Sequence, residues 1–502
     1  MFGKILIANR GEIAVRVAQT VQEMGIAAVA VYSEPDRDAP HVLRADEAYP
    51  LEGKTAAETY LRGDRIIDIA RQHGVDAIHP GYGFLSENAS FAEACGQAGI
   101  AFIGPTPEVI RATGDKVIAK RTLAAAGVPV VPGWSGTGDE SADAMTREAE
   151  KIGFPLLVKA AAGGGGKGMR IVRNDRDLAS AIEAAQREAG AAFGDSRVFL
   201  EKYLDRPRHV EFQVFGDHHG HIVHLFEREC SIQRRHQKII EETPSPALTP
   251  ALRERMGEAA VRAARSVHYT NAGTVEFLVD DQGEFYFLEV NTRLQVEHPV
   301  TEMATGHDLV RAQILVAAGE ELPFTQKDLK QDGHSIEARI CAEDAAREFL
   351  PSTGTIEVFV PPVGPGIRVD SGVTRGSEVS VFYDSMLAKL IVKGRSRDES
   401  LTKLAWALDR FVVLGVTTNI AFLRALIGHP EFRAGRLHTQ FLQEHSISSP
   451  DGAEIPPEVL IAAALSVSQS DRSRGSDRHG RPGSTVVAFD APWRSGDAWR
   501  GA

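Results

Sequence analysis

Four consecutive glycines and a lysine stand out in the segment AAAGGGGKGMR, residues 160–170. Glycine lets backbone N–H groups approach phosphate oxygens closely, and Lys159 and Lys167 add positive charge. The segment does not fit the P-loop pattern G-x-x-x-x-G-K-[ST], because Met169 follows Gly168 where that pattern requires a lysine. The residues therefore predict a phosphate-binding loop of another kind.

The residues on both sides of the glycines predict strands, in FPLLVKA (154–160) and MRIVRND (169–175). Gly163, Gly165 and Gly168 match G-x-G-x-x-G, but a dinucleotide-binding loop requires a helix after the glycines. Strand, glycine loop and strand form a hairpin whose tip can cover a nucleotide, as in protein kinases. We predict a lid over ATP, and the alternative is a hairpin tip without a ligand.

A second hairpin, GTVEFLVDDQGEFYFLEVN (273–291), carries two carboxylates that are predicted to face each other. Antiparallel pairing about a turn formed by Asp281, Gln282 and Gly283 sets Glu276 opposite Glu289, with Asn291 on the same face. Directly opposed like charges destabilise a sheet, so a cation is expected between them unless one carboxyl is protonated. Oxygen ligands of this kind suit Mg²⁺ together with substrate phosphates. In the alternative, both glutamates lie on a solvated face and lysines screen them.

The elements that must position these residues change in kind along the chain. Near the N-terminus, strands alternate with helices, which predicts a doubly wound parallel sheet. From residue 154 hairpins predominate, at 154–174, 210–226 and 274–291, and 334–395 is again rich in strands. The predicted fold class is therefore α/β followed by α+β.

Composition narrows the class of protein. The 502 residues suggest about three domains, and 43% hydrophobic and 25% charged residues are typical of a soluble globular protein. Three widely spaced cysteines argue against disulfides and zinc, and we expect a cytoplasmic protein without a signal peptide or membrane span. The net charge of −12 argues against nucleic-acid binding.

The last part of the chain, residues 447–502, has a different composition. Ser, Arg, Asp and Gly dominate residues 465–485, which favours a linker without a core of its own. Trp493 and Trp499 then stand close to the end of the chain. We predict a linker followed by a docking segment.

Six motifs together resemble one family. KILIANRGEIAVRV, HPGYGFLSEN, GGGGKGMR, ECSIQRRHQKIIEE, NTRLQVEHPVTE and SIEARICAED are similar to segments of biotin carboxylases, which have the ATP-grasp fold. The resemblance covers residues 1 to about 446. It implies a Rossmann-like domain at 1–114, an ATP-grasp domain at 115–330 with its lid at about 131–203, and a β-rich C-terminal subdomain at 331–446.

The resemblance also implies a nucleotide site. By position, ATP would contact two glycines of the lid and several basic residues, namely Lys116, Lys159, Gly165, Gly166, His209 and His236. The hinge EKYL would hold adenine through the backbone of Glu201, Lys202, Tyr203 and Leu204. Glu276, Glu289 and Asn291 match the family's ligands for Mg²⁺, which Mn²⁺ can replace, and the two glutamates therefore also contact the nucleotide.

The resemblance implies a second site for bicarbonate and biotin. Lys238, Arg293, Gln295 and the backbone of Val296 would hold bicarbonate, and Glu297 would be the general base. Arg339 would face biotin, whose pocket Tyr82 and Gly83 would line. Lys238, Arg293, Glu297 and Arg339 are thus the predicted catalytic residues. Arg339 would stabilise the negative charge that develops on the ring oxygen of biotin.

The resemblance requires biotin on a lysine within a Met-Lys-Met tripeptide, which does not occur here. The predicted partners are therefore a separate biotin carboxyl carrier protein and carboxyltransferase subunits, in a homodimer or larger assembly. The terminal APWRSGDAWR favours an acyl-CoA carboxylase as the parent complex. Two alternatives remain at this point: another ATP-grasp carboxylate ligase, and a nucleotide-binding regulatory subunit without turnover.

Overall fold

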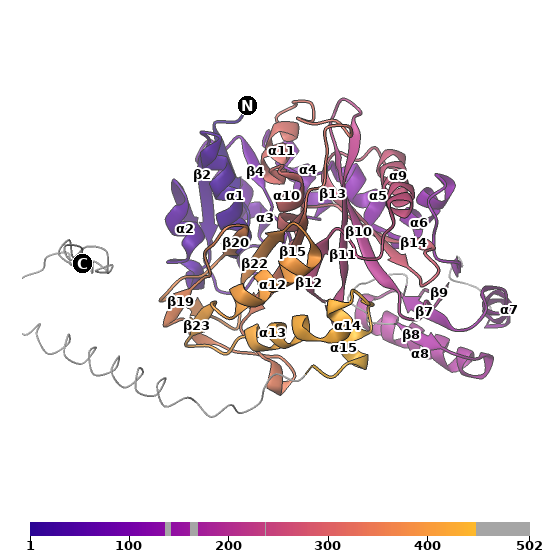
Figure 1. Cartoon of the computed structure of the whole chain (residues 1–502). Helices are drawn as coiled ribbons and strands as arrows, with labels where there is room; N and C mark the ends of the chain where they lie inside the picture. Colours follow the sequence, from indigo (N-terminus) through magenta and orange to yellow (C-terminus); the bar gives the residue numbers. More distant parts are fainter. Residues whose placement is uncertain (136–141, 161–168, 236, 448–502) are drawn as a thin grey trace, which may run out of the picture. The chain divides into compact units, whose positions relative to one another are not determined.

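The computed structural model describes residues 1–135, 142–160, 169–235 and 237–447 (Figure 1). The predicted lid glycines Gly165 and Gly166, His236 and the predicted docking segment lie outside the described residues. The predictions made for them are therefore untested.

The first sheet is parallel and has the order β3-β2-β1-β4-β5. Its strands are β1 (Lys4–Ile7), β2 (Ala27–Tyr32), β3 (Glu47–Pro50), β4 (Ala77–His79) and β5 (Ala101–Phe102). The helices that alternate with them are α1 (Gly11–Glu23), α2 (Pro40–Arg44), α3 (Gly63–Gln72) and α4 (Ala89–Gln97), followed by α5 (Pro107–Gly114). The predicted doubly wound arrangement is confirmed.

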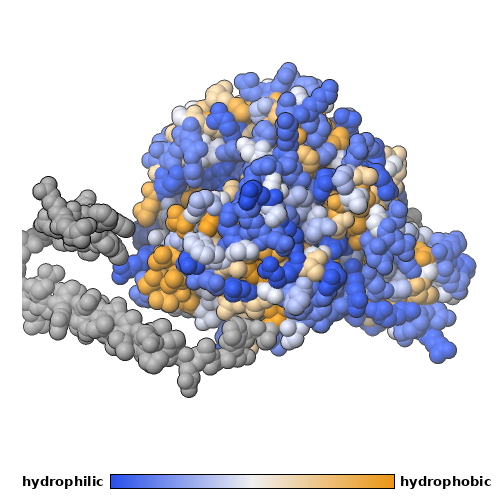
Figure 2. Space-filling model, in the orientation of Figure 1, coloured by the Kyte–Doolittle hydropathy of each residue, from blue (hydrophilic) through white to orange (hydrophobic). Residues whose placement is uncertain are grey.

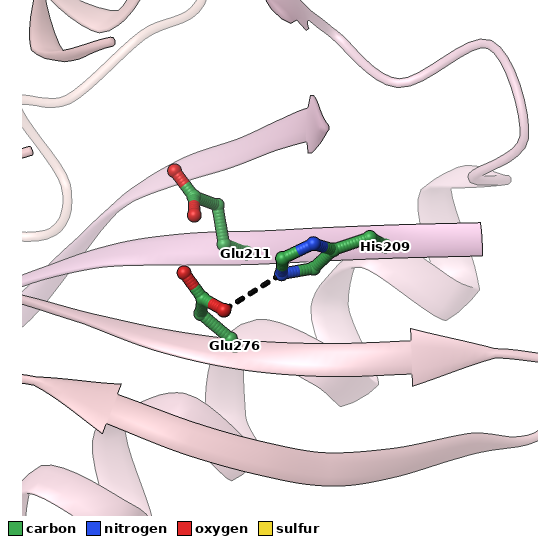
Figure 3. Close-up of side chains that lie close together, drawn as sticks. All are labelled: His209, Glu211 and Glu276. Carbon is green, nitrogen blue, oxygen red and sulfur yellow. Dashed lines mark hydrogen bonds and ion pairs between the residues drawn. The ribbon is translucent and has the colours of Figure 1, made fainter. Parts of the chain in front are cut away.

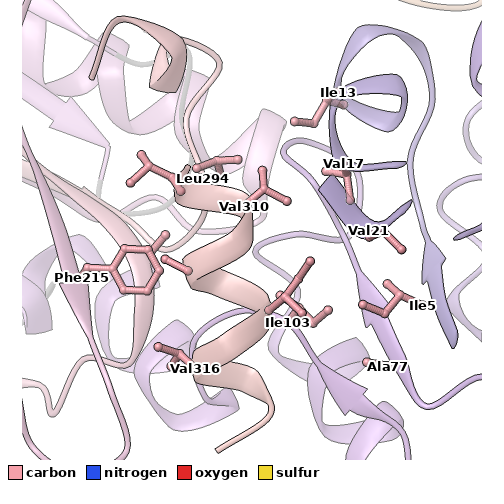
Figure 4. Close-up of a cluster of buried hydrophobic side chains, with 14 of the residues drawn as sticks. Ile5, Ile13, Val17, Val21, Ala77, Ile103, Phe215, Leu294, Val310 and Val316 are labelled. Atoms are coloured by element: carbon pink, nitrogen blue, oxygen red, sulfur yellow. The ribbon is translucent and has the colours of Figure 1, made fainter. Parts of the chain in front are cut away.

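Alternation along β1 explains why helices cover both faces of this sheet. Ile5 and Ile7 point into a core with Val17 of α1, whereas Leu6 points into a second core with Ile66 of α3. Figure 4 shows the first core, in which α11 (Leu309–Ala317) lies between α1 and β10 (Arg208–Gly216). Phe215 therefore joins the first sheet to the second through α11.

The second sheet is antiparallel and has the order β14-β13-β10-β11-β12-β15-β22-β20. The remaining strands are β11 (Ile222–Arg234), β12 (Gln237–Thr243), β13 (Asn271–Val279), β14 (Phe285–Asn291), β15 (His334–Cys341), β20 (Ile367–Ser371) and β22 (Met386–Gly394). Because β12 pairs with β15, the sheet continues across the predicted boundary at 330/331. The predicted ATP-grasp core and the C-terminal subdomain therefore share one sheet.

Helices cover this second sheet on both faces. α9 (Pro250–Ser266) packs on β10 and β11, and α12 (Arg397–Leu408) packs on β15 and β22. Ile336, Ala338 and Ile340 of β15 belong to the core that α12 and α13 (Ile420–Gly428) complete. Alternation turns the odd-numbered residues of β15 to the opposite face, where α10 (His298–Thr305) packs.

A third sheet, ordered β6-β9-β7-β8, forms the predicted lid region. Its strands are β6 (Gly133–Ser135), β7 (Leu156–Ala160), β8 (Arg170–Val172) and β9 (Val198–Lys202), and its helices are α7 (Ala142–Ile152) and α8 (Leu178–Phe193). β7 and β8 pair antiparallel, which confirms the strand–loop–strand prediction. The other elements are α6 (Lys116–Ala125), α14 (Pro430–Arg433), α15 (Phe441–Glu444), β16 (Glu343–Asp344), β17 (Leu350–Pro351), β18 (Gly354–Thr355), β19 (Val358–Val360), β21 (Glu378–Val379) and β23 (Val412–Leu414).

The face of the molecule in Figure 2 is mostly hydrophilic, with apolar side chains gathered near β19 and β23. Val360, Val412 and Leu414 are exposed apolar residues of these two strands, at 52%, 40% and 54% of their surface. Among the helices that the structure describes, none combines the length and the apolar character needed to cross a bilayer.

Candidate active site

A row of charged side chains crosses the second sheet. The strand register pairs Arg228 of β11 with Glu211 of β10, Glu211 with Glu276 of β13, and Glu276 with Glu289 of β14. The predicted opposition of Glu276 and Glu289 is thus confirmed. It depends on a bulge next to Glu276, since the pairs closer to the turn, such as Phe277 with Phe287, would otherwise set Leu288 opposite Glu276.

The ammonium group of Lys238 supplies a cation beside this row. Its Nζ lies 2.9 Å from Glu276 Oε1 and 2.6 Å from Glu297 Oε1, and it also donates to Glu211. His209 contributes a further contact, with Nε2 2.8 Å from Glu276 Oε2 (Figure 3). Glu276 is buried, so it does not lie on a solvated face as the alternative requires.

These contacts set the charge states of the carboxyls. Burial raises the pKa of Glu276, but the Lys238 ammonium and His209 outweigh burial and hold that pKa well below its usual range. Burial dominates at Glu211, whose pKa is raised although Lys238 and Arg228 oppose it. A cation bound by these oxygen atoms would favour the ionised form of the carboxyls further.

Glu297 lies beside this row of charged side chains, at the start of α10. It occupies the N-cap position of α10, without a capping hydrogen bond from its side chain, and is fully buried. Its Oε1 binds Lys238, and its Oε2 lies 3.0 Å from Nη2 of Arg339. Burial raises its pKa, but Lys238 and Arg339 hold the pKa well below the usual range. Glu297 is therefore ionised at neutral pH and can accept a proton.

Arg339 has a second partner that the sequence did not indicate. Its Nε donates to Oε1 of Glu241 at 2.7 Å, and Glu241 is fully buried on β12. Burial raises the pKa of Glu241 to about 7, although Arg339 lowers it. Arg339 thus lies between two carboxylates, one on β12 and one at the start of α10.

The loop between β14 and α10 holds the remaining predicted anion ligands. Nε of Arg293 lies 2.9 Å from Oε2 of Glu87, and its Nη1 donates to Oε1 of Gln295 at 3.0 Å. Gln295 is buried, and among the described residues its Nε2 has no hydrogen-bond partner. A buried donor without a partner is costly, so this amide is suited to bind an anion next to Arg293. The oxygen of Val296 accepts a hydrogen bond from Lys389 at 2.8 Å.

The structure brings Lys238, Glu276, Asn291, Arg293, Gln295, Glu297 and Arg339 into one network of direct contacts. Nδ2 of Asn291 donates to Glu276 Oε1 at 2.8 Å, and Oδ1 of Asn291 accepts from Arg293. Two carboxylates and an amide oxygen form the donor set of Glu276, Glu289 and Asn291, which fits the oxygen ligands that Mg²⁺ prefers. A magnesium ion is therefore compatible with these residues.

The other predicted residues lie around this network. Lys159 of β7 pairs with Glu201 at the end of β9, and so does Lys120 of α6, which was not predicted. The hinge amides of Lys202 and Tyr203 donate to the carbonyls of Pro132 and Pro155. Lys116 begins α6, but its side chain is not among those described. Tyr82 and Gly83 follow β4, and the Tyr82 hydroxyl donates to Glu12.

Sequence reasoning missed the carboxylates that pair with the predicted cations, which are Glu87, Glu211 and Glu241. It also missed Lys389, which donates to the carbonyl oxygen of Val296. Glu87 and Glu241 belong to motifs that carried the resemblance, HPGYGFLSEN and ECSIQRRHQKIIEE, but they were not singled out there. Glu211 and Lys389 lie outside those motifs. The alternation of β10 could have indicated Glu211, because it lies two residues from His209 on one face of the strand.

Three family models match consecutive parts of the chain. They are "Biotin carboxylase, N-terminal domain" at residues 1–110, "Carbamoyl-phosphate synthase L chain, ATP binding domain" at 115–325 and "Biotin carboxylase C-terminal domain" at 337–444. Together they span the residues that carry the row of carboxylates, the anion ligands and Arg339.

Curated relatives share about half of the sequence. The mitochondrial methylcrotonoyl-CoA carboxylase subunit alpha of Rattus norvegicus is 52% identical over 92% of this chain and 65% of that protein. The corresponding subunit of Dictyostelium discoideum is 50% identical over 97% of this chain and 70% of that protein. A biotin carboxylase of Halalkalibacterium halodurans is 52% identical over 89% of this chain and 98% of that protein. The chain thus spans somewhat less than two thirds of the rat subunit's length.

Solved structures are similar over the same region. The biotin carboxylase domain of Hydrogenobacter thermophilus 2-oxoglutarate carboxylase, a dimer in complex with MgADP and bicarbonate, matches with a TM-score of 0.84 at 49% identity. It covers 89% of this chain and 98% of that chain. Biotin carboxylase from Campylobacter jejuni matches with a TM-score of 0.85 at 46% identity, over 89% and 99% of the two chains.

Proposed function

The chain belongs to the biotin carboxylase family and is an ATP-dependent ligase, and we propose that it carboxylates biotin on a separate carrier protein for an acyl-CoA carboxylase. The position of the Lys238 ammonium group, in contact with both Glu276 and Glu297, is the single observation that best supports this chemistry. It links the predicted metal ligand Glu276 to the predicted base Glu297, so the γ-phosphate of ATP and bicarbonate would meet beside one ammonium group.

The nucleotide would lie between the lid and the row of carboxylates. Because Lys202 and Tyr203 already donate to backbone carbonyls, Leu204 is the hinge amide that we assign to adenine. Glu276, Glu289 and Asn291 would hold Mg²⁺, which neutralises phosphate charge when bound. Lys159 would turn from Glu201 to the phosphates.

Bicarbonate would bind to Arg293, Lys238 and Nε2 of Gln295, which has no hydrogen-bond partner among the described residues. The planar guanidinium of Arg293 suits a planar anion. Glu87 fixes the orientation of this guanidinium. Glu297 would then remove the proton of bicarbonate as a bicarbonate oxygen attacks the γ-phosphate and ADP leaves. The product, carboxyphosphate, breaks into CO₂ and phosphate.

The second step would take place at Arg339. Phosphate removes the proton from the ureido nitrogen of biotin, and this nitrogen attacks CO₂. Negative charge develops on the ureido oxygen, and Arg339 would stabilise it as a fixed cation in a site from which water is excluded. Tyr82 and Gly83 would line the ring.

Bicarbonate-dependent hydrolysis of ATP, measured with and without free biotin, tests the proposed function. We expect ADP release to require bicarbonate and to increase with biotin. Hydrolysis that requires a different carboxylate or an amine would identify another ATP-grasp ligase. ATP binding without turnover would identify a regulatory subunit.

The length of one match supports an acyl-CoA carboxylase as the parent complex, although the methylcrotonoyl-CoA carboxylase subunits alpha of Oryza sativa and Glycine max match over 88% of this chain. The match to the Dictyostelium acyl-CoA carboxylase subunit covers 97% of this chain and so includes part of residues 447–502. The matches to the Halalkalibacterium enzyme and to the 2-oxoglutarate carboxylase domain cover 89%. The native complex, isolated through a tag on this chain, should fix labelled bicarbonate into an acyl-CoA. Fixation only into pyruvate or 2-oxoglutarate would contradict this assignment.

We also propose that the chain acts in a homodimer or larger assembly with carrier and carboxyltransferase subunits. The dimer of the Hydrogenobacter domain supports this proposal. Light scattering after size exclusion should give at least twice the mass of the 502-residue chain. A monomer at micromolar concentration would contradict it.

A further inference from the structure

Lys389, in the middle of β22, is a fully buried lysine that the proposed chemistry does not use. Lysine is almost never fully buried unless it is paired. Its Nζ donates to the carbonyl oxygen of Val296 at 2.8 Å and lies 3.0 Å from Oε1 of Glu12. The first contact fixes the peptide bond between Val296 and Glu297, and therefore the backbone from which the predicted base projects.

Glu12 continues this chain of contacts toward another part of the site. It lies in the first turn of α1, is buried, and accepts a hydrogen bond from the hydroxyl of Tyr82. Its second carboxylate oxygen is buried and, within the described ranges, without a hydrogen-bond partner. The contacts therefore run from Val296 through Lys389 and Glu12 to Tyr82, and join four segments that are distant in sequence.

We propose that Lys389 is a positioning residue that couples the bicarbonate pocket to the biotin pocket. This inference rests on the proposed function, which assigns Val296 and Glu297 to bicarbonate and Tyr82 to biotin. One ammonium group contacts both the Val296 carbonyl and Glu12, and Glu12 accepts the hydrogen bond of Tyr82. The Val296 peptide and the Tyr82 ring would therefore keep a fixed separation. A displacement of one would then be transmitted to the other.

The charges around Lys389 explain why a cation is needed there. Asp370 of β20 and Glu337 of β15 interact electrostatically with it in addition to Glu12, and the Tyr82 ring centroid lies 5.8 Å from its Nζ. Burial raises the pKa of Glu12, and Lys389 opposes this increase. Without Lys389, the contacts to both Val296 and Glu12 would be lost. Neither the Val296 peptide nor Glu12, which accepts the hydrogen bond of Tyr82, would then be held by the ammonium group.

The variant Lys389→Met tests the inference, because methionine keeps the length of the side chain but has no ammonium group. We expect the KM for bicarbonate and the KM for free biotin to rise about tenfold each, the effect of losing a charged hydrogen bond. The KM for ATP should stay within twofold. Lys393→Met is the matched control, because Lys393 lies on the same strand and pairs at 3.1 Å with the exposed Asp332. All three KM values of the control should be unchanged.

A second variant separates coupling from a merely structural role. Tyr82→Phe removes only the hydroxyl, which does not contact bicarbonate. It should nevertheless raise the KM for bicarbonate about threefold in the wild type, the scale of one hydrogen bond, and should not raise it further in Lys389→Met. Additive effects of the two substitutions would overturn the inference.

Two further outcomes are decisive. If Lys389→Met does not fold, the double variant Glu12→Gln with Lys389→Met, which removes both charges, should fold and show the same rise in the two KM values. The inference would be overturned if the KM values for bicarbonate and biotin stayed within twofold of the wild type, or if they rose together with the KM for ATP. Either result would leave the proposed function intact. A wild type without bicarbonate-dependent ATP hydrolysis would overturn the proposed function and this inference with it.

Discussion

Replacement of Arg339 by alanine should separate the two steps of the proposed reaction. Arg339 would stabilise charge that develops only on biotin, whereas Glu297 would act earlier, on bicarbonate. The loss of one oxyanion partner typically lowers a rate by about a hundredfold to a thousandfold. Carboxylation of free biotin by Arg339→Ala should therefore fall by this factor.

The structure limits how far the first step should suffer. Arg339 contacts Glu297 Oε2 at 3.0 Å, so its removal also takes one of two cations from the proposed base. Lys238 remains 2.6 Å from Oε1 and keeps Glu297 ionised at neutral pH. We therefore expect bicarbonate-dependent ATP cleavage to fall by about tenfold, the lower end of the effect of one hydrogen bond to a charged group, because Lys238 remains. The ratio of carboxylation to ATP cleavage should fall at least about tenfold.

The same variant leaves Glu241 without its ion-pair partner. A buried charge without a partner can cost about 3–5 kcal/mol of unfolding free energy. Because burial already raises the pKa of Glu241 to about 7, this carboxyl should take up a proton and the loss should be smaller. Denaturant unfolding at pH 7 checks that the variant is folded.

The assay measures ADP release and acid-stable label from bicarbonate in the same reaction. Arg436→Ala is a suitable control, because this arginine pairs with Glu431 on the surface and should leave both rates unchanged. Equal losses of ATP cleavage and carboxylation in Arg339→Ala would refute the reasoning. Arg339 would then organise the bicarbonate pocket through Glu297 and would not be the partner of biotin.

Three further predictions concern other parts of the molecule. Glu276→Gln should raise the Mg²⁺ concentration required for ATP cleavage at least about tenfold, because a carboxylate ligand is lost; an unchanged Mg²⁺ titration would contradict the assigned metal site. Burial raises the pKa of Glu242, but His334 and Arg397 lower this pKa to about 2. The contribution of Glu242 to the free energy of unfolding, about 3 kcal/mol, should therefore be complete above about pH 4.5 and lost as the pH falls toward 2. Urea unfolding of the wild type and Glu242→Gln between pH 7 and 3.5 should show the difference shrinking below pH 4.5, and a constant difference would contradict it. Truncation after residue 446 should leave biotin-dependent ATP cleavage within twofold, whereas its loss would place the tail in the active domain.

The hairpins could be predicted because alternation and turn residues are local signals. The pairing of Glu276 with Glu289 depends on more than such local signals. The bulge next to Glu276 sets the final register, and no residue type in the hairpin specifies it. The parallel first sheet was likewise predictable from its alternation of short apolar strands and amphipathic helices.

The partners of the site residues could not be predicted in this way. Lys238 contacts Glu276, which is 38 residues away, and Glu297, which is 59 residues away. Arg293 contacts Glu87, which is 206 residues away. Contacts of this kind depend on which strands become neighbours in the second sheet. No local sequence pattern predicts the order β10-β11-β12-β15-β22. The contacts of Glu241 and Lys389 follow from this strand order and could not be predicted without it.

The fate of oxygen from bicarbonate tests the central claim most directly. If bicarbonate attacks the γ-phosphate, one of its oxygens must remain on phosphorus when carboxyphosphate breaks down. With ¹⁸O-labelled bicarbonate and ATP, the wild type should therefore release inorganic phosphate that carries one ¹⁸O atom, and Glu297→Gln should release almost none. Phosphate without label, formed at the full wild-type rate of ATP hydrolysis, would mean that water attacks ATP and would contradict the proposed function.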